Sequence, residues 1–407
     1  MNLTWKDNSV APSEAEVRAA VEAVEDPDLR RAIGELGVVR SVGVKRRSIT
    51  VVLAMPVAKW PAAVVVTGAV TSVVEELGGP GSARVDVEVM TDDERAALHR
   101  HLAAPSGEPD HGHGGPRADH FHGQQRAPGA APGPLGHEEG RPNRFMIPGT
   151  RTRVIGISSG KGGVGKSSVT VNLAVGLAAR GYEVGLLDAD VYGFSVPKML
   201  GVTAGPVAID ELLVPPVVHG VRCLSMGFFV PDEQPVIWRG PMLHKALEQF
   251  LVDAYWGEPD YLLIDMPPGT GDVALSLGQY LPRTEVLVVT TPQPAAQRVA
   301  QRSAYAAKQL SLPVRGVIEN MSWFTGDDGA RYDLFGAGGG EALAAALEVP
   351  LLGRIPFVPA VRRGADEGVP VRISDPNGEA SLAFEALADR VEAIGPARIY
   401  RRELTLR

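Results

Sequence analysis

The residues with the clearest capacity for chemistry form one glycine-rich segment, Gly160-Lys161-Gly162-Gly163-Val164-Gly165-Lys166-Ser167. It fits the pattern GxxxxGK[ST], in which successive backbone N–H groups surround phosphate oxygens. In such a loop Lys166 would neutralise the β- and γ-phosphates, and the Ser167 hydroxyl would take a Mg²⁺ position. An apolar run over 154–158 precedes the segment, and a helical pattern over 168–180 follows it. We therefore predict a nucleotide phosphate site on a strand–loop–helix unit, in preference to a chance glycine-rich turn.

The other lysine of this segment, Lys161, is a charge that the phosphate-loop pattern does not require. Its place directly after Gly160 is poorly suited to assist Lys166 in the same site. From there it could reach a phosphate across a subunit interface, which predicts a homodimer with nucleotide at the contact. The alternative is a lysine that is simply solvated at the surface.

A carboxylate for the metal follows a second apolar run. Asp265 comes after four apolar residues, 261–264, and before Met266-Pro267-Pro268-Gly269. An acid at the end of a buried strand matches a Walker B residue, which holds Mg²⁺ directly or through water. The stiff turn after it offers backbone N–H groups that can sense a γ-phosphate. The alternative role for Asp265 is that of a helix N-cap.

Two further carboxylates, Asp188 and Asp190, follow the apolar run 184–187. One of the two can support the Mg²⁺ shell while the other orients the attacking water. The alternative for Asp188 is to cap the turn that follows it.

The elements that must position these residues alternate between apolar strands and helical patterns from residue 151 onward. The expected strands are 184–188, 261–265, 285–290, 314–319 and 351–355, and the expected helices include 242–255 and 379–394. Together with the phosphate-loop motif, this alternation predicts an α/β fold of the P-loop NTPase class, with a mostly parallel sheet and helices on both faces. Such sheets bind ligands at the carboxyl ends of their strands, where each of the acids above is placed.

Residues 1–102 predict a separate small α+β domain. Helical patterns cover 14–24 and 62–77, and strand patterns cover 33–44, 48–54 and 85–89. We expect the domain with the phosphate loop to span 151–395 and to be followed by a tail over 396–407.

Residues 103–150 predict a flexible linker, because they are rich in glycine and proline and poor in aliphatic side chains. Seven of the nine histidines of the chain lie in or just before it, namely His99, His101, His111, His113, His120, His122 and His137. They could bind Zn²⁺ or Ni²⁺, but a low-complexity linker without metal is the simpler interpretation.

Composition narrows the range of partners. The chain has 407 residues, a formal net charge of −8 and 44% hydrophobic residues, which argues against a dominant role on nucleic acid or on a membrane surface. The N-terminus lacks the apolar core of a signal peptide. The most apolar stretch, 48–74, is interrupted by Pro56, Lys59 and Pro61, so we expect no membrane span and a cytoplasmic location.

Cys223 is the single cysteine, so no intrachain disulfide can form. It lies in the apolar run 221–226, which predicts a buried strand. Burial would remove hydration from a thiolate and raise the pKa of the thiol.

The loop with its two lysines resembles the deviant Walker A loop of the MinD, ParA and Mrp ATPases. Three further segments extend the resemblance specifically to the Mrp-type ATPases, described as carriers of iron–sulfur clusters: 238–242 (WRGPM), 265–269 (DMPPG) and 319–322 (ENMS). Segments 24–29 and 35–39 resemble the small N-terminal domain of iron–sulfur assembly proteins.

This resemblance implies a role for each candidate residue. Lys161 would contact the nucleotide bound by the partner subunit of a homodimer, and Asp190 would position the attacking water. Asp188 and Asp265, with Ser167, would then serve the Mg²⁺. Asn320 would read the adenine base, which its amide can do by donating and accepting at once. ATP, Mg²⁺ and an iron–sulfur cluster are the implied ligands, with iron–sulfur client or scaffold proteins as partners.

The sequence departs from the family where the family has cysteines. The N-terminal domain usually has Cys-Pro where this chain has Met55-Pro56, and a Cys-x-x-Cys is common soon after ENMS, where 323–332 has none. A cluster generally requires four thiolates, or two with two histidines. We therefore predict no stable cluster held through cysteine pairs.

Three hypotheses follow: an Mrp-type ATPase in iron–sulfur delivery, a nucleotide-switched dimer that acts on a client without a cluster, and a ParA/MinD-like ATPase on DNA or membrane. The third needs a basic surface or an amphipathic terminal helix, and residues 399–407 are too short for one. We favour the first for the cellular role, with the second close to it in chemistry.

Overall fold

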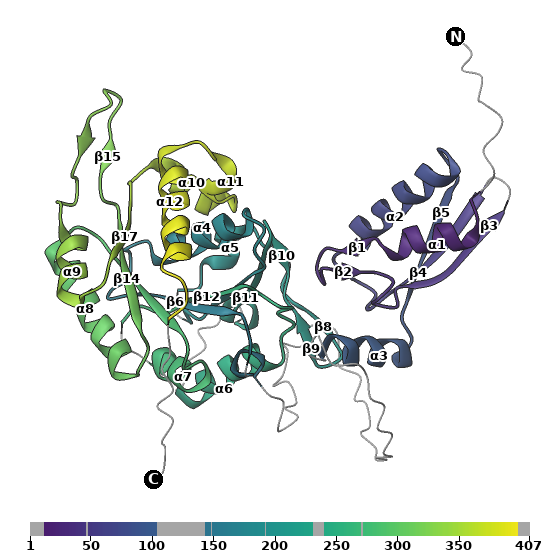
Figure 1. The fold of residues 1–407 in the computed structure, drawn as a ribbon, viewed down its shortest axis with the longest axis horizontal. Helices are drawn as coiled ribbons and strands as arrows, with labels where there is room; N and C mark the ends of the chain where they lie inside the picture. Colours follow the sequence, from purple (N-terminus) through teal and green to yellow (C-terminus); the bar gives the residue numbers. More distant parts are fainter. Residues whose placement is uncertain are drawn as a thin grey trace. The chain divides into compact units, whose positions relative to one another are not determined.

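The computed structural model of the chain describes residues 12–45, 48–103, 143–147, 149–191, 193–230, 240–269 and 272–397 (Figure 1). Contacts divide the chain into two units. The N-terminal unit groups 1–121 with 207–214, and the C-terminal unit groups 122–206 with 215–407. Most of the predicted linker, residues 104–142, and its histidines from His111 onward lie outside the described residues. The predicted domain boundaries therefore stay predictions.

The N-terminal unit is a three-stranded sheet packed against helices, as expected for a small α+β domain. Its elements are α1 (Glu14–Glu22), β1 (Glu25–Asp26), β2 (Arg31–Ala32), β3 (Val39–Lys45), β4 (Ser48–Met55), α2 (Ala63–Gly78), β5 (Ala83–Val89) and α3 (Asp92–Ala103). The order is β3-β4-β5, with β3 and β4 antiparallel and β4 and β5 parallel around α2. The short hairpin of β8 (Val207–Ile209) and β9 (Leu212–Val214) is grouped with this unit.

One expected element of this unit is shorter than predicted. The strand expected over 33–44 begins only at Val39, because a chain of turns precedes it. Gly37 has a φ of +67° in these turns, a left-handed conformation that a strand does not contain. The apolar side chains before it, such as Ile33 and Leu36, are nonetheless buried, which explains why the hydrophobic pattern indicated a strand.

The C-terminal unit is built on an eight-stranded sheet in the order β10-β11-β7-β12-β6-β13-β14-β17. Every neighbouring pair is parallel except β10 with β11, so the predicted mostly parallel sheet is confirmed. The strands are β6 (Arg153–Ser159), β7 (Val184–Asp188), β10 (Val217–Val218), β11 (Val221–Ser225), β12 (Tyr261–Asp265), β13 (Glu285–Thr290), β14 (Val314–Asn320) and β17 (Leu351–Ile355).

Helices cover both faces of this sheet (Figure 1). Alternate side chains of β13 point to opposite faces of the sheet and belong to two different hydrophobic cores. Leu287 and Val289 belong to the core beneath α4 (Lys166–Ala178), α5 (Val196–Leu200), α11 (Val371–Ser374) and α12 (Glu379–Ala393). Val286 and Val288 belong to the core beneath α8 (Pro294–Gln309) and α9 (Gly339–Leu347). The continuous apolar runs in the sequence therefore reflect strands buried on two sides.

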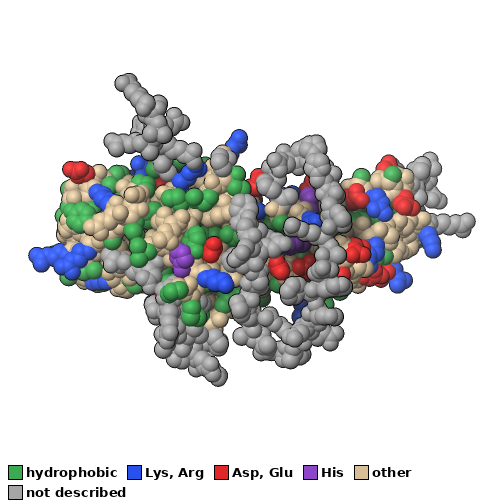
Figure 2. Space-filling view, turned by 90° about the horizontal axis from the view of Figure 1, so that it is seen from below, with side chains coloured by type: hydrophobic (Ala, Val, Ile, Leu, Met, Phe, Trp, Pro, Cys, Tyr) green, Lys and Arg blue, Asp and Glu red, His purple; other side chains and the backbone are tan. Residues whose placement is uncertain are grey.

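The remaining described elements are α6 (Gly240–Val252), α7 (Asp272–Tyr280), α10 (Pro359–Glu367), two 3₁₀ turns at Arg144–Met146 and Met226–Phe229, and a hairpin of β15 (Phe324–Thr325) and β16 (Arg331–Tyr332). Within the described residues, no helix combines the length and the apolar character that a membrane span requires. On the face of the molecule seen in Figure 2, acidic and basic side chains lie interspersed.

Candidate functional site

The glycine-rich loop joins β6 to α4 in the predicted strand–loop–helix arrangement. The helix begins at Lys166, two residues earlier than the periodicity indicated, and Gly165 is its N-cap with a φ of +79°. A Cβ at Gly160 would lie 2.2 Å from the backbone nitrogen of Ala300 on α8. Both positions therefore require glycine, one for its conformation and the other for the close approach of a helix.

The loop forms one wall of a cavity of about 710 Å³. The facing wall comes from the segment after β7, through Asp190 and Val191, and from the turn after β12, through Pro267 and Pro268. Cavities of a few hundred to a thousand cubic ångströms are typical of small-ligand sites. The cavity lies at the carboxyl ends of the strands, where the sheet topology predicted it.

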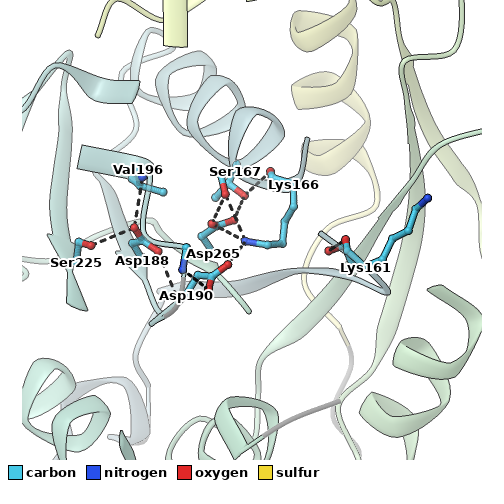
Figure 3. A network of polar contacts seen from close by, with 11 residues as sticks. Lys161, Lys166, Ser167, Asp188, Asp190, Val196, Ser225 and Asp265 are labelled. Carbon is cyan, nitrogen blue, oxygen red and sulfur yellow. Dashed lines mark hydrogen bonds and ion pairs between the residues drawn. The ribbon is translucent and has the colours of Figure 1, made fainter. Parts of the chain in front are cut away.

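Lys166 and Ser167, which line this cavity, belong to a compact polar cluster (Figure 3). The Lys166 Nζ is 2.5 Å from Asp265 Oδ2. The Ser167 hydroxyl donates to the same carboxylate oxygen over 2.6 Å, and the Thr170 hydroxyl donates to Oδ1 over 2.7 Å. Asp265 is fully buried, so this carboxylate has exchanged its water for three protein partners.

Thr170 did not stand out in the sequence, although a signal was present. It lies four residues after Lys166, one helical turn along α4. Residues at that spacing share a helix face, so a hydroxyl there faces the same carboxylate. Leu243 and Val273, which also line the cavity, gave no such signal, because their approach depends on the packing of α6 and α7.

Asp190 lies at the edge of the same cluster. Its Oδ2 is 4.0 Å from Lys166 Nζ, and its Oδ1 accepts a hydrogen bond from the backbone N–H of Gly193 over 3.1 Å. It is only 7% exposed but lines the cavity. A carboxylate in this place is suited to accept a hydrogen bond from a water molecule inside the cavity.

Asp188 is adjacent to Asp265 in the sheet register, on the neighbouring strand β7. Its carboxylate accepts hydrogen bonds from the backbone N–H groups of Asp190 and Val196 and from the Ser225 hydroxyl, at 3.2, 3.3 and 3.0 Å. These contacts hold the segment between β7 and α5 in place (Figure 3). Burial first, and then the nearby Asp265 carboxylate, raises the pKa of Asp188 to about 7.

The two lysines of the loop differ in direction. Lys166 points into the acidic cluster, whereas the Lys161 side chain extends away from it (Figure 3). The backbone carbonyl of Lys161 accepts a hydrogen bond from the Ser159 hydroxyl over 3.1 Å, which fixes the start of the loop. Lys161 nevertheless belongs to the residues that line the cavity.

Asn320 is the last residue of β14 and is 7% exposed. Its amide Nδ2 donates to the backbone carbonyl of Val164 over 2.8 Å. The structure therefore places Asn320 against the phosphate loop itself. The family segment 238–242 lies only partly within the described residues, where Gly240, Pro241 and Met242 begin α6.

The donors of this polar cluster fit Mg²⁺. The Ser167 hydroxyl and the Asp265 carboxylate are hard oxygen ligands, and Mg²⁺ is bound in nucleotide sites through one or two such groups together with phosphate and water. A single positive charge, the Lys166 ammonium, already lies among these oxygens. The cluster is therefore built to hold a cation.

Cys223 lies at the centre of β11, where it is paired with Leu186 and is fully buried. Burial first, and then Asp188, raises the pKa of its thiol well above the usual value. Segment 323–332 forms the β15–β16 hairpin. Trp323 Nε1 and the Thr325 hydroxyl donate to the Glu379 carboxylate, and Arg331 stacks over Trp323 at 4.4 Å.

The loop geometry, the buried Lys166–Asp265 pair and the parallel sheet define this chain as a P-loop NTPase. The profile of the family described as NUBPL iron-transfer P-loop NTPase matches residues 150–392, and that of the iron-sulfur cluster assembly protein matches residues 14–87. The chain belongs to this family of iron-transfer P-loop NTPases, and its predicted membership of the Mrp-type cluster carriers is confirmed.

Two relatives agree with this assignment, and the chain is also similar to a solved structure. The chain is 41% identical over 382 residues to the iron-sulfur cluster carrier protein of Mycobacterium tuberculosis (strain ATCC 25618 / H37Rv), covering 92% of each chain. It is 36% identical over 382 residues to the protein of the same name from Synechocystis, covering 92% of this chain and 96% of the relative. A solved nucleotide-binding protein from Archaeoglobus fulgidus in complex with ADP is 33% identical, with 57% and 93% coverage and a TM-score of 0.49.

Proposed function

We propose that the protein binds and hydrolyses ATP with Mg²⁺ and uses this cycle to deliver iron–sulfur clusters to client or scaffold proteins. The observation that carries the proposal is the convergence of Lys166, Ser167 and Asp265 beneath a glycine loop that lines a cavity. A phosphate group bound by this loop would meet the N-terminus of α4 and the Lys166 ammonium.

Each polar group has a proposed part in the reaction. Loop N–H groups and Lys166 would bind the phosphates, and Ser167 and Asp265 would hold Mg²⁺, which would supply charge neutralisation for the developing negative charge. Asp190 accepts a hydrogen bond from the attacking water and orients it. Asp188 supports the metal side of the site through the segment that it anchors, because its hydrogen bonds reach Asp190 and Val196.

Lys161 is proposed to act in a homodimer. A lysine whose side chain extends away from the acidic cluster around Lys166 (Figure 3) can contact the phosphate of a second subunit related by a two-fold axis. Contact made only in the closed, triphosphate-bound dimer would shift the population toward that state. Binding and hydrolysis of ATP would then switch the protein between two assemblies.

A second function has one observation in its favour, the lack of cysteine pairs. The only thiol in the sequence is Cys223, and it is buried within the sheet. The alternative is an ATP-switched dimer that acts on a protein client, or on a cysteine-bearing partner, without ligating a cluster itself. The cytoplasmic location, the lack of nucleic-acid and membrane partners and a base-reading role for Asn320 stay predictions.

Anaerobic reconstitution with iron and sulfide, followed by absorbance and metal analysis, tests whether the chain itself ligates a cluster. We expect no stoichiometric iron and sulfide on the purified protein. Stoichiometric cluster that is lost in Cys223→Ala would support direct ligation, and iron that is lost only on deletion of 105–149 would indicate the histidine tract. The ATPase proposal is tested independently by Lys166→Ala, which should remove nearly all turnover because phosphate charge would go unneutralised.

A further inference from the structure

The phosphate loop is held from outside by a side chain that comes from a distant part of the sequence. Asn320 ends β14, and its backbone pairs with Ile355 of β17. The next residue, Met321, has a φ of +57°, so the chain turns sharply directly after Asn320. Strand pairing on one side and a fixed turn on the other leave the Asn320 backbone little freedom, and its side chain is correspondingly well placed.

The contact between Asn320 and the loop is close and dry. Asn320 Nδ2 donates to the Val164 carbonyl over 2.8 Å, and Val164 is 2% exposed. A Cβ built on the neighbouring Gly165 would lie 2.2 Å from the same Nδ2 atom. Gly165, at a φ of +79°, therefore has no side chain where the amide of Asn320 approaches.

This hydrogen bond sets the direction of a loop N–H group. The peptide unit between Val164 and Gly165 is planar and trans, so its carbonyl and its N–H point in opposite directions. With the carbonyl held toward Asn320, the N–H of Gly165 is directed to the other side of the loop. A phosphate cradle needs its N–H groups to face inward before the anion arrives, because reorientation at binding would reduce affinity.

We propose that Asn320 is a positioning residue of the phosphate loop, which fixes the Val164–Gly165 peptide in the orientation that binds phosphate. This inference rests on the proposed nucleotide-binding function of the loop. This role of Asn320 differs from a role in reading the adenine base in one measurable respect. A base-reading amide separates ATP from GTP, whereas a residue that fixes the loop acts on the triphosphate, whichever base is attached.

The test compares the affinity of the full-length protein for ATP, GTP and inorganic tripolyphosphate, each with Mg²⁺, by calorimetry. Asn320→Ala leaves the buried Val164 carbonyl without its partner, and such a loss corresponds to about a tenfold weakening. We expect the same factor for all three ligands. Asn320→Asp keeps the shape of the side chain but sets an oxygen against the Val164 carbonyl. Its affinity for the ligands should therefore fall further than that of Asn320→Ala.

Asn172→Ala is the matched control. Asn172 is also a buried amide in the C-terminal unit, and its Nδ2 donates to the Ser168 carbonyl within α4 at 2.9 Å. Its replacement should leave the affinity for each of the three ligands unchanged. Thermal unfolding without ligand checks the folding of each variant. If Asn320→Ala fails to fold, Asn320→Gln decides the question, because it keeps the amide but moves it from its place against the Val164 carbonyl.

Two results would overturn the proposal. Weakening of ATP alone, with unchanged GTP and tripolyphosphate, would assign Asn320 to the base. Unchanged affinity for all three ligands in both variants would show that the hydrogen bond does not position the loop. A wild-type protein that binds none of the three would instead contradict the proposed nucleotide site, which keeps the two failures distinct.

Discussion

The Lys166–Asp265 pair allows the sharpest prediction about the metal site. The Lys166 ammonium lies 2.5 Å from the Asp265 carboxylate, and the two side chains are 7% and 0% exposed. We predict that Lys166→Met destabilises the C-terminal unit, because it leaves a buried anion without its cation. Loss of one partner of a buried ion pair costs about 3–5 kcal/mol. The lower end applies here, because the Ser167 and Thr170 hydroxyls still donate to Asp265.

A divalent cation should restore much of this loss in the variant and little in the wild type. In Lys166→Met the Asp265 carboxylate and the Ser167 hydroxyl remain as ligands without a competing ammonium. At a Mg²⁺ concentration one hundred times the dissociation constant, binding to the folded state contributes about 2.7 kcal/mol. In the wild type, Mg²⁺ must first displace the Lys166 ammonium. Mg²⁺ added without nucleotide should therefore bind more weakly and stabilise the folded state less.

Both effects are measured by urea unfolding, once with EDTA and once with Mg²⁺. Tryptophan fluorescence, to which the buried Trp256 contributes, monitors the transition. Lys308→Met is the control, since Lys308 Nζ donates to the backbone carbonyl of Leu347 on α9 over 3.0 Å and is not part of the Asp265 cluster. It should lose little stability and show no dependence on Mg²⁺. Equal stability of Lys166→Met and wild type in EDTA, or an equal gain from Mg²⁺ in both, would refute the reasoning.

Three further predictions concern single residues. Lys161→Ala should weaken dimerisation with a slowly hydrolysed ATP analogue, measured by sedimentation, and association constants equal to wild type would contradict the role across the interface. Thr170→Val should lower stability by about 1–2 kcal/mol in urea, because Asp265 loses a hydrogen bond; an unchanged midpoint would argue against that bond. Cys223 should react with a thiol reagent only after denaturation, since burial raises its pKa; rapid reaction of the native protein would oppose this.

Much of the fold was accessible from the sequence because its strongest signals are local. The run before Gly160, the loop glycines and the helical pattern after Lys166 belong to one continuous segment, and the structure has β6, the loop and α4 there. Apolar runs bounded by turns likewise predicted β7, β12 and β13 at their observed bounds. The error at 33–38 arose because turns with buried apolar side chains carry the same hydrophobic pattern as a strand.

The contacts inside the site were less accessible, because they depend on the order of strands in the sheet. The sequence places Asp188 and Asp265 at strand ends but does not make β7 and β12 neighbours, and it is this pairing that sets the two carboxylates side by side. The same holds for Asn320, whose contact with Val164 spans 156 positions of the chain. Motif spacing identifies the residue types that a site uses, whereas long-range packing decides which atoms they meet.

The separation of nucleotide and cluster chemistry in this chain follows from the same sheet. The phosphate loop, Asp190 and Asp265 are at the carboxyl edge and line or border a cavity, where a ligand can reach them. Cys223 is in the middle of β11, where it pairs with Leu186 of β7, the strand that ends at Asp188. Its side chain is fully buried. A thiol in that position cannot reach a cluster without opening the sheet. We therefore expect the ATP cycle to operate without any change at Cys223, and a partner to supply the thiolates for any cluster that is transferred.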